Sequence, residues 1–348
     1  MKKEKVKKWM NILLFIITVG ILVYFCISDN NLQTLINILP SLNIMWMILA
    51  VFVVILSWYF DSVCIYLILS DISKEKYSRL SSFKLTMIGQ LFSAVTPLGV
   101  GGQPMQILSL TGKGVQAGNS ISIFVRKFLI YQATAAFYSV LSVIIKFKFF
   151  TSQIPVFIPL ALIGLISQCF MVALILLFYV NRKFTSKIIN WFFYLLSKVK
   201  IIKNPDEMSK KFEEQLDTYI KNNKQMSQNK ILSLKLYLFT FLQFTCLFSI
   251  PFFIYKAFNN PGFPIIDMIC AQTFLNMVAS YTPLPGAAGT TESVFLLLFA
   301  NFFSDDLLAS AMLICRIITY YFCIVFGFII YQIKTIKIKK LNFISNQK

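Results

Sequence analysis

The stretch Tyr281-Thr282-Pro283-Leu284-Pro285-Gly286-Ala287-Ala288-Gly289-Thr290-Thr291-Glu292 interrupts one of the most hydrophobic parts of the chain. Its prolines and glycines cannot continue a helix, because proline lacks the backbone N–H and glycine is too flexible. A broken backbone at membrane depth is tolerated only where protein or a water-filled cavity satisfies its N–H and C=O groups. Because the carboxylate of Glu292 follows the break, the stretch predicts a binding site inside a membrane.

The composition around this stretch predicts an all-α integral membrane protein. Of the 348 residues 57% are hydrophobic, and the mean hydropathy is +0.71. Soluble domains average about 45–50% apolar residues, and a nearly uncharged run of about 18 or more predicts a transmembrane helix. The chain has several such runs, so we expect one multi-pass membrane domain over residues 1–348.

We predict six full spans and two interrupted segments that enter the membrane and return on the same side. The first interrupted segment breaks at about 96–104, and the second breaks at 281–292. Each arm of these segments is shorter than the roughly 20 residues that a spanning helix needs. The six spans are expected at Trp9–Ile27, Ile44–Leu69, Ser120–Phe149, Ile154–Val180, Ile231–Phe258 and Leu307–Tyr331.

The chain has a net charge of +19, and its basic residues cluster in loops and tails. Their distribution predicts how the chain is oriented in the membrane. With both interrupted segments re-entrant, the N-terminus, the loop near 70–84, the basic linker 181–230 and the C-terminal tail all face the cytoplasm. These segments hold 5, 4, 11 and 5 Lys/Arg residues, as the positive-inside rule requires of short loops. We therefore expect a cell-membrane protein with cytoplasmic termini. The first hairpin would enter from the cytoplasm and the second from outside.

Charges inside the spans receive different expectations. Asp61 is expected to snorkel harmlessly from the cytoplasmic end of its span, whereas Lys146 is expected near the outer edge. Within the linker, apolar residues at helical spacing over 184–199 alternate with lysines, which predicts a helix lying on an anionic membrane surface.

Two parts of the chain match each other. Residues 90–98 (QLFSAVTPL) align with residues 276–284 (NMVASYTPL), and each copy has an amide six residues before Thr-Pro-Leu. Each copy is followed some thirty residues later by an arginine with a tyrosine five residues further on. This match predicts an inverted repeat over about 44–150 and 231–332, with the binding site between the two breaks.

The candidate site residues are charged and amide side chains in the apolar segments and the residues of the two breaks. Arginine suits phosphate because its planar fork donates two parallel hydrogen bonds. Three roles stay open for Glu292: pairing with an arginine, binding an ammonium group, or carrying a proton. The candidates are Gln90, Thr96, Pro97, Gly101, Gly102, Gln103, Gln106, Arg126, Tyr131, Asn276, Pro283, Pro285, Gly286, Gly289, Glu292 and Arg316.

The residue inventory also argues against several chemistries. The chain has no histidine, which removes Ser–His and Cys–His catalysis and the commonest metal ligand. Its seven cysteines form no C-x-x-C, and no G-x-x-x-x-G-K-[ST] motif appears. We expect no catalytic residue, no metal, no cofactor and no direct nucleic-acid binding.

The sequences Gly101-Gly102-Gln103-Pro104-Met105-Gln106, Arg126–Gln132 and Pro283–Glu292 together resemble the lysylphosphatidylglycerol synthase transmembrane family. This family is also described as the flippase-like domain of the multiple peptide resistance factor. The resemblance covers nearly the whole chain and implies movement of aminoacylated phosphatidylglycerol, or a related lipid, between leaflets. This chain departs from the family at Ala287-Ala288, where a more glycine-rich run is expected.

Three alternatives to a lipid flippase stay open. Full-length members of the family add a soluble domain that transfers lysine from lysyl-tRNA to phosphatidylglycerol. The chain ends about 17 residues after its last predicted span, so we expect it to be at most a membrane component of that enzyme. The others are a transporter of polyprenyl-phosphate-linked lipids and a non-transporting scaffold. The expected partner is an anionic or aminoacylated phospholipid, with a homo-oligomer as a further possibility.

Overall fold

The apolar runs form long helices, because a helix pairs its own backbone N–H and C=O groups within the segment. The computed structural model describes residues 38–72, 77–153, 157–198, 210, 213 and 228–333, and these residues contain helices and no strand. The all-helical prediction is confirmed for this part of the chain. The predicted first span, Trp9–Ile27, and the basic C-terminal tail lie outside the described residues.

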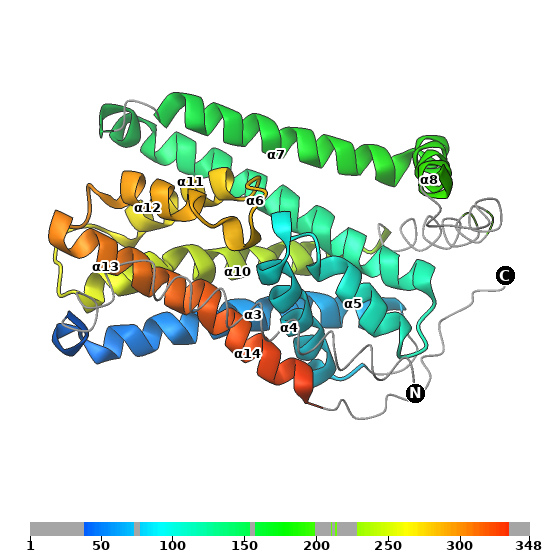
Figure 1. Ribbon diagram of the computed structural model, residues 1–348, viewed down its shortest axis with the longest axis horizontal. Helices are drawn as coiled ribbons and strands as arrows, with labels where there is room; N and C mark the ends of the chain where they lie inside the picture. The colour runs from blue at the N-terminus through cyan, green and yellow to red at the C-terminus, as the bar shows by residue number, and fades with distance from the viewer. Residues whose placement is uncertain are drawn as a thin grey trace.

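Long helices occupy the positions of five predicted spans and run side by side in Figure 1. Four of them are long and apolar enough to cross a bilayer, which supports a multi-pass membrane protein. These four are α3 (Ile44–Ile72), α6 (Ala117–Gln153), α10 (Lys230–Ala257) and the continuous run of α13 (Asp305–Arg316), the π-helical turn η4 (Ile317–Tyr321) and α14 (Phe322–Gln332). The fifth is α7 (Phe157–Val180), and a short turn η1 (Leu39–Ser41) precedes α3.

Both interrupted segments form a helix, a break and a second helix. In the first, α4 (Arg79–Val95) ends before the turn η2 (Pro97–Gly99), and α5 (Gly102–Thr111) returns along α4. In the second, α11 (Ile265–Ala279) ends before the turn η3 (Pro285–Ala287), and α12 (Thr290–Phe299) returns along α11. We call these two units hairpin 1 and hairpin 2.

The contacts of the two halves, α3 to α6 and α10 to α14, are reciprocal. Helix α3 packs along α10, so the first helix of each half contacts its counterpart. Helix α4 of hairpin 1 packs against α14, and α11 of hairpin 2 packs against α6. Each hairpin is therefore held by the last long helix of the other half, and the turns η2 and η3 contact each other.

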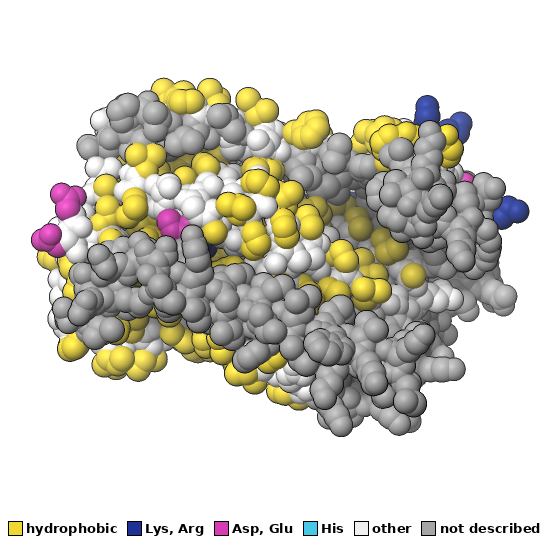
Figure 2. Space-filling view, viewed as in Figure 1, with side chains coloured by type: hydrophobic (Ala, Val, Ile, Leu, Met, Phe, Trp, Pro, Cys, Tyr) yellow, Lys and Arg dark blue, Asp and Glu magenta, His cyan; other side chains and the backbone are white. Residues whose placement is uncertain are grey.

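Aromatic side chains fill the interior between these helices. The rings of Phe295 and Phe299 stack with centroids 4.2 Å apart, and Phe150 meets Phe274 edge-on at 4.9 Å. Many large apolar side chains are also exposed on the outside, and Figure 2 shows yellow patches of them on one face. An exposed apolar surface of this extent fits contact with lipid tails rather than with water.

Helix α8 (Arg182–Lys198) follows α7 directly and crosses its end in Figure 1. Its exposed residues include Lys183, Lys187, Trp191 and Tyr194, which combines basic and aromatic side chains on one short helix. The predicted helix in this part of the linker is confirmed. Its position on a membrane surface stays a prediction, and most of the linker beyond it lies outside the described residues.

Candidate functional site

The two breaks meet each other, because η2 of hairpin 1 contacts η3 of hairpin 2. Tyr320, on the π-helical turn η4, connects them. Its hydroxyl donates to the Ala94 carbonyl at the end of α4 (3.1 Å), and its ring lies against Gly286 of η3. A Cβ on Gly286 would lie 2.2 Å from that ring, so only glycine fits there.

Each break turns through left-handed backbone. In η2 this conformation falls on Leu98 (φ 56°) and Gly99 (φ 66°), and in η3 on Gly286 (φ 59°) and Ala287 (φ 52°). A residue with a Cβ pays about 1–2 kcal/mol for this region. Ala287 therefore carries backbone strain of this kind in η3.

Uncharged contacts hold the break of hairpin 1. The Thr96 hydroxyl donates to the Phe92 carbonyl (2.7 Å) and accepts from the Gly101 amide (2.9 Å), which closes the turn. Farther down, the buried Gln106 side chain of α5 donates to the Leu85 carbonyl of α4 (2.9 Å).

Hairpin 1 also needs glycine where its two helices touch. A Cβ on Gly102 would lie 2.1 Å from the Ser93 hydroxyl and 2.5 Å from the Gly89 carbonyl. The backbones of α4 and α5 thus approach closely, and Gly101, Gly102 and Gln106 fix that approach.

A buried ion pair holds the break of hairpin 2. Arg316 ends α13, is 8% exposed, and donates through Nε to Glu292 Oε1 (2.6 Å). Its Nη2 lies 2.5 Å from the same oxygen, and its Nη1 donates to the Gly286 carbonyl (3.0 Å). All three guanidinium nitrogens therefore face η3 and the first turn of α12. Of the three open roles of Glu292, pairing with an arginine is the one that the structure displays.

A cavity of about 30 Å³ lies against Arg316, between α10, α11, α12 and α13. That volume holds one or two water molecules when polar groups line it. Polar side chains from α11, α12 and η4 line it together with Arg316: Gln272, Thr291 and Thr319. The amide side chain of Gln272, on α11, therefore lines a cavity.

Arg126, the sequence counterpart of Arg316, has a different surrounding. It lies in α6, is 6% exposed, and its Nη2 donates to the Ser233 hydroxyl in the first turn of α10 (2.8 Å). Tyr131, five residues further, packs its ring on Phe244 of α10 at 4.7 Å. Both candidates thus engage α10, whereas Arg316 engages a break.

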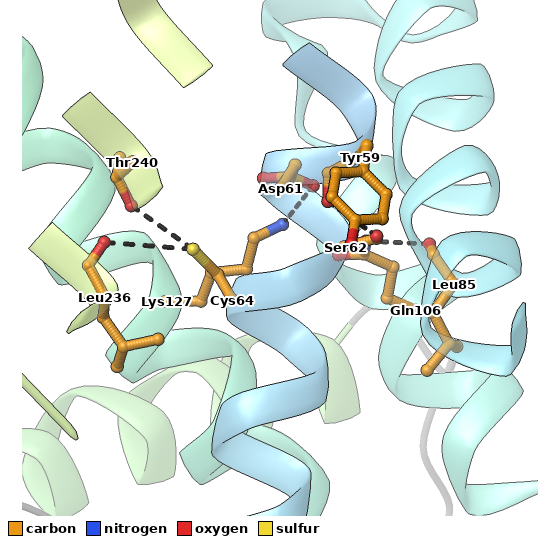
Figure 3. Close-up of polar contacts among 9 residues, drawn as sticks. All are labelled: Tyr59, Asp61, Ser62, Cys64, Leu85, Gln106, Lys127, Leu236 and Thr240. Atoms are coloured by element: carbon orange, nitrogen blue, oxygen red, sulfur yellow. Dashed lines mark hydrogen bonds and ion pairs between the residues drawn. The ribbon is translucent and has the colours of Figure 1, made fainter. Parts of the chain in front are cut away.

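The expectation for Asp61 is wrong. Its side chain does not snorkel to water: the residue is 3% exposed, and Lys127 of α6 donates to it at 2.6 Å. Figure 3 shows Asp61 of α3 with the Lys127 side chain pointing toward it, Thr240 and the Leu236 carbonyl near Cys64 on one side, and Gln106 on the other. A carboxylate near the predicted end of an apolar span finds a cation on a neighbouring helix, because packing brings Lys127 there.

A third buried ion pair was also missed in the sequence. Lys146 of α6 lies 2.6 Å from Asp267 in the first turn of α11, so it is not simply an edge residue. The backbone of α6 departs from helical geometry at Lys146 (φ −121°, ψ 17°). Tyr320 was missed as well, because its part depends on contacts with Gly286 and Ala94.

The remaining candidates lie along the hairpins. Gln90 and Gln103 are half-buried on α4 and α5, and the Asn276 carbonyl accepts from the Ser280 amide at the end of α11 (3.0 Å). Pro97 and Pro283 are exposed at the two breaks, and Pro285 begins η3. Gly289 precedes α12 with φ 81°, and its missing Cβ faces open space.

The residues that the structure describes contain no arrangement of side chains suited to metal binding or to a disulfide. No group of three or more His, Cys, Asp or Glu side chains gathers among them. The six cysteines within those residues are free thiols.

Comparison with known proteins agrees with this architecture. The family model described as lysylphosphatidylglycerol synthase TM region matches residues 11–327. A relative named UPF0104 membrane protein, from Archaeoglobus fulgidus, is 26% identical over 292 residues, which cover 80% of this chain and 83% of the relative. The family match extends over most of the chain and includes both hairpins and the long helices. The chain therefore belongs to the lysylphosphatidylglycerol synthase transmembrane-region family.

Proposed function

We propose that this protein moves a phospholipid with an anionic phosphate, aminoacylated phosphatidylglycerol or a related lipid, between the leaflets of the cell membrane. The observation that carries the proposal is a buried arginine, Arg316, beside the point where two helix breaks meet. An arginine inside a membrane bundle is costly and is retained mainly where it binds or transports something. Membership of a membrane family named for a lysyl-lipid supports a lipid substrate.

The proposed arrangement in the membrane has six full spans, cytoplasmic termini and two re-entrant hairpins that enter from opposite sides. The reciprocal packing of the two halves, α4 on α14 and α11 on α6, supports an inverted repeat over 44–150 and 231–332. The excess of basic residues in the predicted cytoplasmic loops supports the orientation. In transporters with such repeats the binding site lies at the interface of the halves.

The headgroup would bind near Arg316 while the acyl tails stay in lipid. The guanidinium suits a phosphate diester because it donates two parallel hydrogen bonds. Leu98 and Leu284 stand at equivalent positions of the two breaks and are 51% and 52% exposed, which gives the tails an apolar surface beside the polar site. Arg126 would contact the headgroup elsewhere along its path, and the basic α8 would bind the anionic membrane surface.

Reconstituted vesicles test the proposal. Phosphatidylglycerol with a fluorescent acyl chain is placed in both leaflets, and a membrane-impermeant reductant reports how much reaches the outside. We expect the protein to raise the bleached fraction above the half that protein-free vesicles show, and Arg316→Ala to abolish this rise.

Two controls make the result specific. Labelled phosphatidylcholine, which has no net charge, should move more slowly than labelled phosphatidylglycerol. Thr151→Val changes a half-buried residue at the end of α6, away from the breaks, and should leave the rate unchanged. Equal rates for wild type and Arg316→Ala would contradict the proposed site, and no rise with any lipid would contradict transport.

A further inference from the structure

Each of the three guanidinium nitrogens of Arg316 already contacts hairpin 2 in the state that the structure describes. Its Nε and Nη2 both contact Glu292 Oε1 (2.6 and 2.5 Å), and its Nη1 donates to the Gly286 carbonyl. A phosphate that takes two parallel hydrogen bonds from the Nε–Nη2 edge of this guanidinium must displace the carboxylate. Binding of the proposed substrate is therefore an exchange of one anion for another.

Glu292 depends strongly on Arg316. One carboxylate oxygen, Oε1, receives both arginine contacts, and the other, Oε2, is buried with no hydrogen-bond partner among the described residues. A buried carboxylate that loses its cation is expensive, and such groups usually become neutral by taking a proton.

Among the residues that the structure describes, Arg316 is the cation that pairs with Glu292. From α13 and η4 the titratable neighbours are Arg316, Cys315 and Tyr320, whose ring lies 5.2 Å below the guanidinium. Toward α10 and α11 the adjoining cavity is lined by uncharged side chains: Leu247, Pro251, Gln272 and Leu275. Among the described residues around Glu292 no second cation is paired with it, so a proton is the positive charge that can replace Arg316 there without moving other side chains.

We propose that Arg316 exchanges Glu292 for a phosphate anion, and that Glu292 takes up one proton in the same step. Glu292 carboxylate, a proton and the bound anion become neutral Glu292 and an arginine–phosphate pair, so the buried charge is conserved. The cavity of about 30 Å³ beside Arg316 has room for a water that could deliver the proton. Because phosphatidylglycerol carries one negative charge, its movement with one proton is electrically neutral. The identity of the anion as a lipid rests on the proposed function.

Two measurements on the full chain in detergent test the exchange. Short-chain dioctanoyl phosphatidylglycerol is added at several pH values in weak buffer with a pH indicator. We expect one proton taken up per lipid bound, and a Kd that rises about tenfold for each pH unit, because binding and protonation are linked. Binding without proton uptake by the wild type would overturn the exchange and leave the proposed function standing.

Glu292→Gln mimics the neutral glutamate. This variant should bind the same lipid at every pH with no proton uptake and should bind more tightly than wild type at high pH. Equal pH dependence in this variant would overturn the assignment to Glu292. The proton count on the wild type stays decisive if the variant does not fold. As a matched control, the double variant Lys146→Met/Asp267→Asn removes both partners of a different ion pair. Its lipid binding should keep the pH dependence of the wild type.

Inorganic phosphate separates the two sources of the anion. If phosphate alone binds with the same affinity and the same proton uptake, the exchange holds and the lipid function is contradicted. If neither anion binds, the site is wrong and both proposals are overturned. Dioctanoyl phosphatidylcholine, whose phosphate is balanced by an ammonium, should bind more weakly than the phosphatidylglycerol.

Discussion

Hairpin 1 and hairpin 2 have the same plan but are held in different ways. In hairpin 1 the contacts are neutral and local: Thr96 closes the turn, Gln106 bonds α4, and Gly102 lets the two backbones touch. In hairpin 2 the turn is held by a charge from another element, Arg316, through Glu292 and the Gly286 carbonyl.

The two hairpins differ in whether a change of pH or the binding of an anion can break the contacts that hold the turn. Steric contacts and neutral hydrogen bonds do not depend on pH or on an anionic ligand. A buried ion pair depends on both, since either partner can be neutralised or captured. We therefore expect the turn of hairpin 1 to keep its contacts when pH or an anionic ligand changes, and the turn of hairpin 2 to be released by either change, although the two sequences match.

The largest effect should come from Arg316→Ala, which breaks the holding contact of hairpin 2. Removing one partner of a buried pair typically costs about 3–5 kcal/mol because the other charge stays buried. We expect a loss of this size in the free energy of unfolding, measured in mixed micelles. Replacing both partners, Arg316→Gln with Glu292→Gln, should restore much of it. A loss no greater in Arg316→Ala than in the double variant would contradict the contrast.

Gly102→Ala should damage hairpin 1 through sterics alone. The new Cβ would meet the Ser93 hydroxyl and the Gly89 carbonyl, so the two helices must move apart, at a cost of about 1–3 kcal/mol. Gly289→Ala is the counterpart in hairpin 2, where no atom lies within 4 Å and only backbone strain of about 1–2 kcal/mol remains. Thermal unfolding of both variants should rank Gly102→Ala as the less stable.

Gln106→Leu should cost about 1 kcal/mol, the usual net value of one interhelical hydrogen bond. We expect the rate at which this variant moves phosphatidylglycerol between leaflets to keep the pH dependence of the wild type, since hairpin 1 has no part in the ion pair. Gln116→Leu, at an exposed position before α6, should change stability by less than about 0.5 kcal/mol. A changed pH dependence of transport in Gln106→Leu would show that hairpin 1 is coupled to the ion pair of hairpin 2, and it would contradict the contrast between them.

The smallest effect concerns the cation beside hairpin 1. Lys113 follows α5, and burial, with Lys84 nearby, lowers its pKa from 10.5 to about 8. Between these values the unfolded chain binds more protons than the folded one, so stability rises with pH from about 8 to 10.5. Lys113→Met should therefore stabilise the protein at pH 7, and its advantage should shrink as the pH rises to 10.5. A constant difference across this range would show that Lys113 titrates normally.

Much of the fold follows from the sequence because its causes are local. Proline and glycine end a helix wherever they stand, so the breaks near 96–104 and 281–292 fall at the predicted positions. The long apolar runs form the expected helices for the same reason. The sequence also identified Gln106 as a candidate. Whether its amide lines a cavity or hydrogen-bonds α4 depends on how closely Gly89 lets α5 approach α4.

The partners of the buried charges could not be predicted in the same way. Arg126 and Arg316 occupy matching positions in the two copies, yet one donates to Ser233 and the other to Glu292. Asp61 was expected near water and instead pairs with Lys127, 66 residues away. Such partners lie on different helices, so their distance is fixed by helix packing.

The sequence by itself determined that this is a helical membrane protein with two matching helix breaks and several charges in apolar segments. These properties depend on backbone chemistry and on the cost of placing a charge in lipid, which each residue carries wherever it stands. Only the tertiary structure decided that the breaks touch, that Tyr320 joins them, and that Arg316 closes hairpin 2. A buried charge takes the partner that the surrounding helices bring within hydrogen-bond distance, and that depends on the whole bundle.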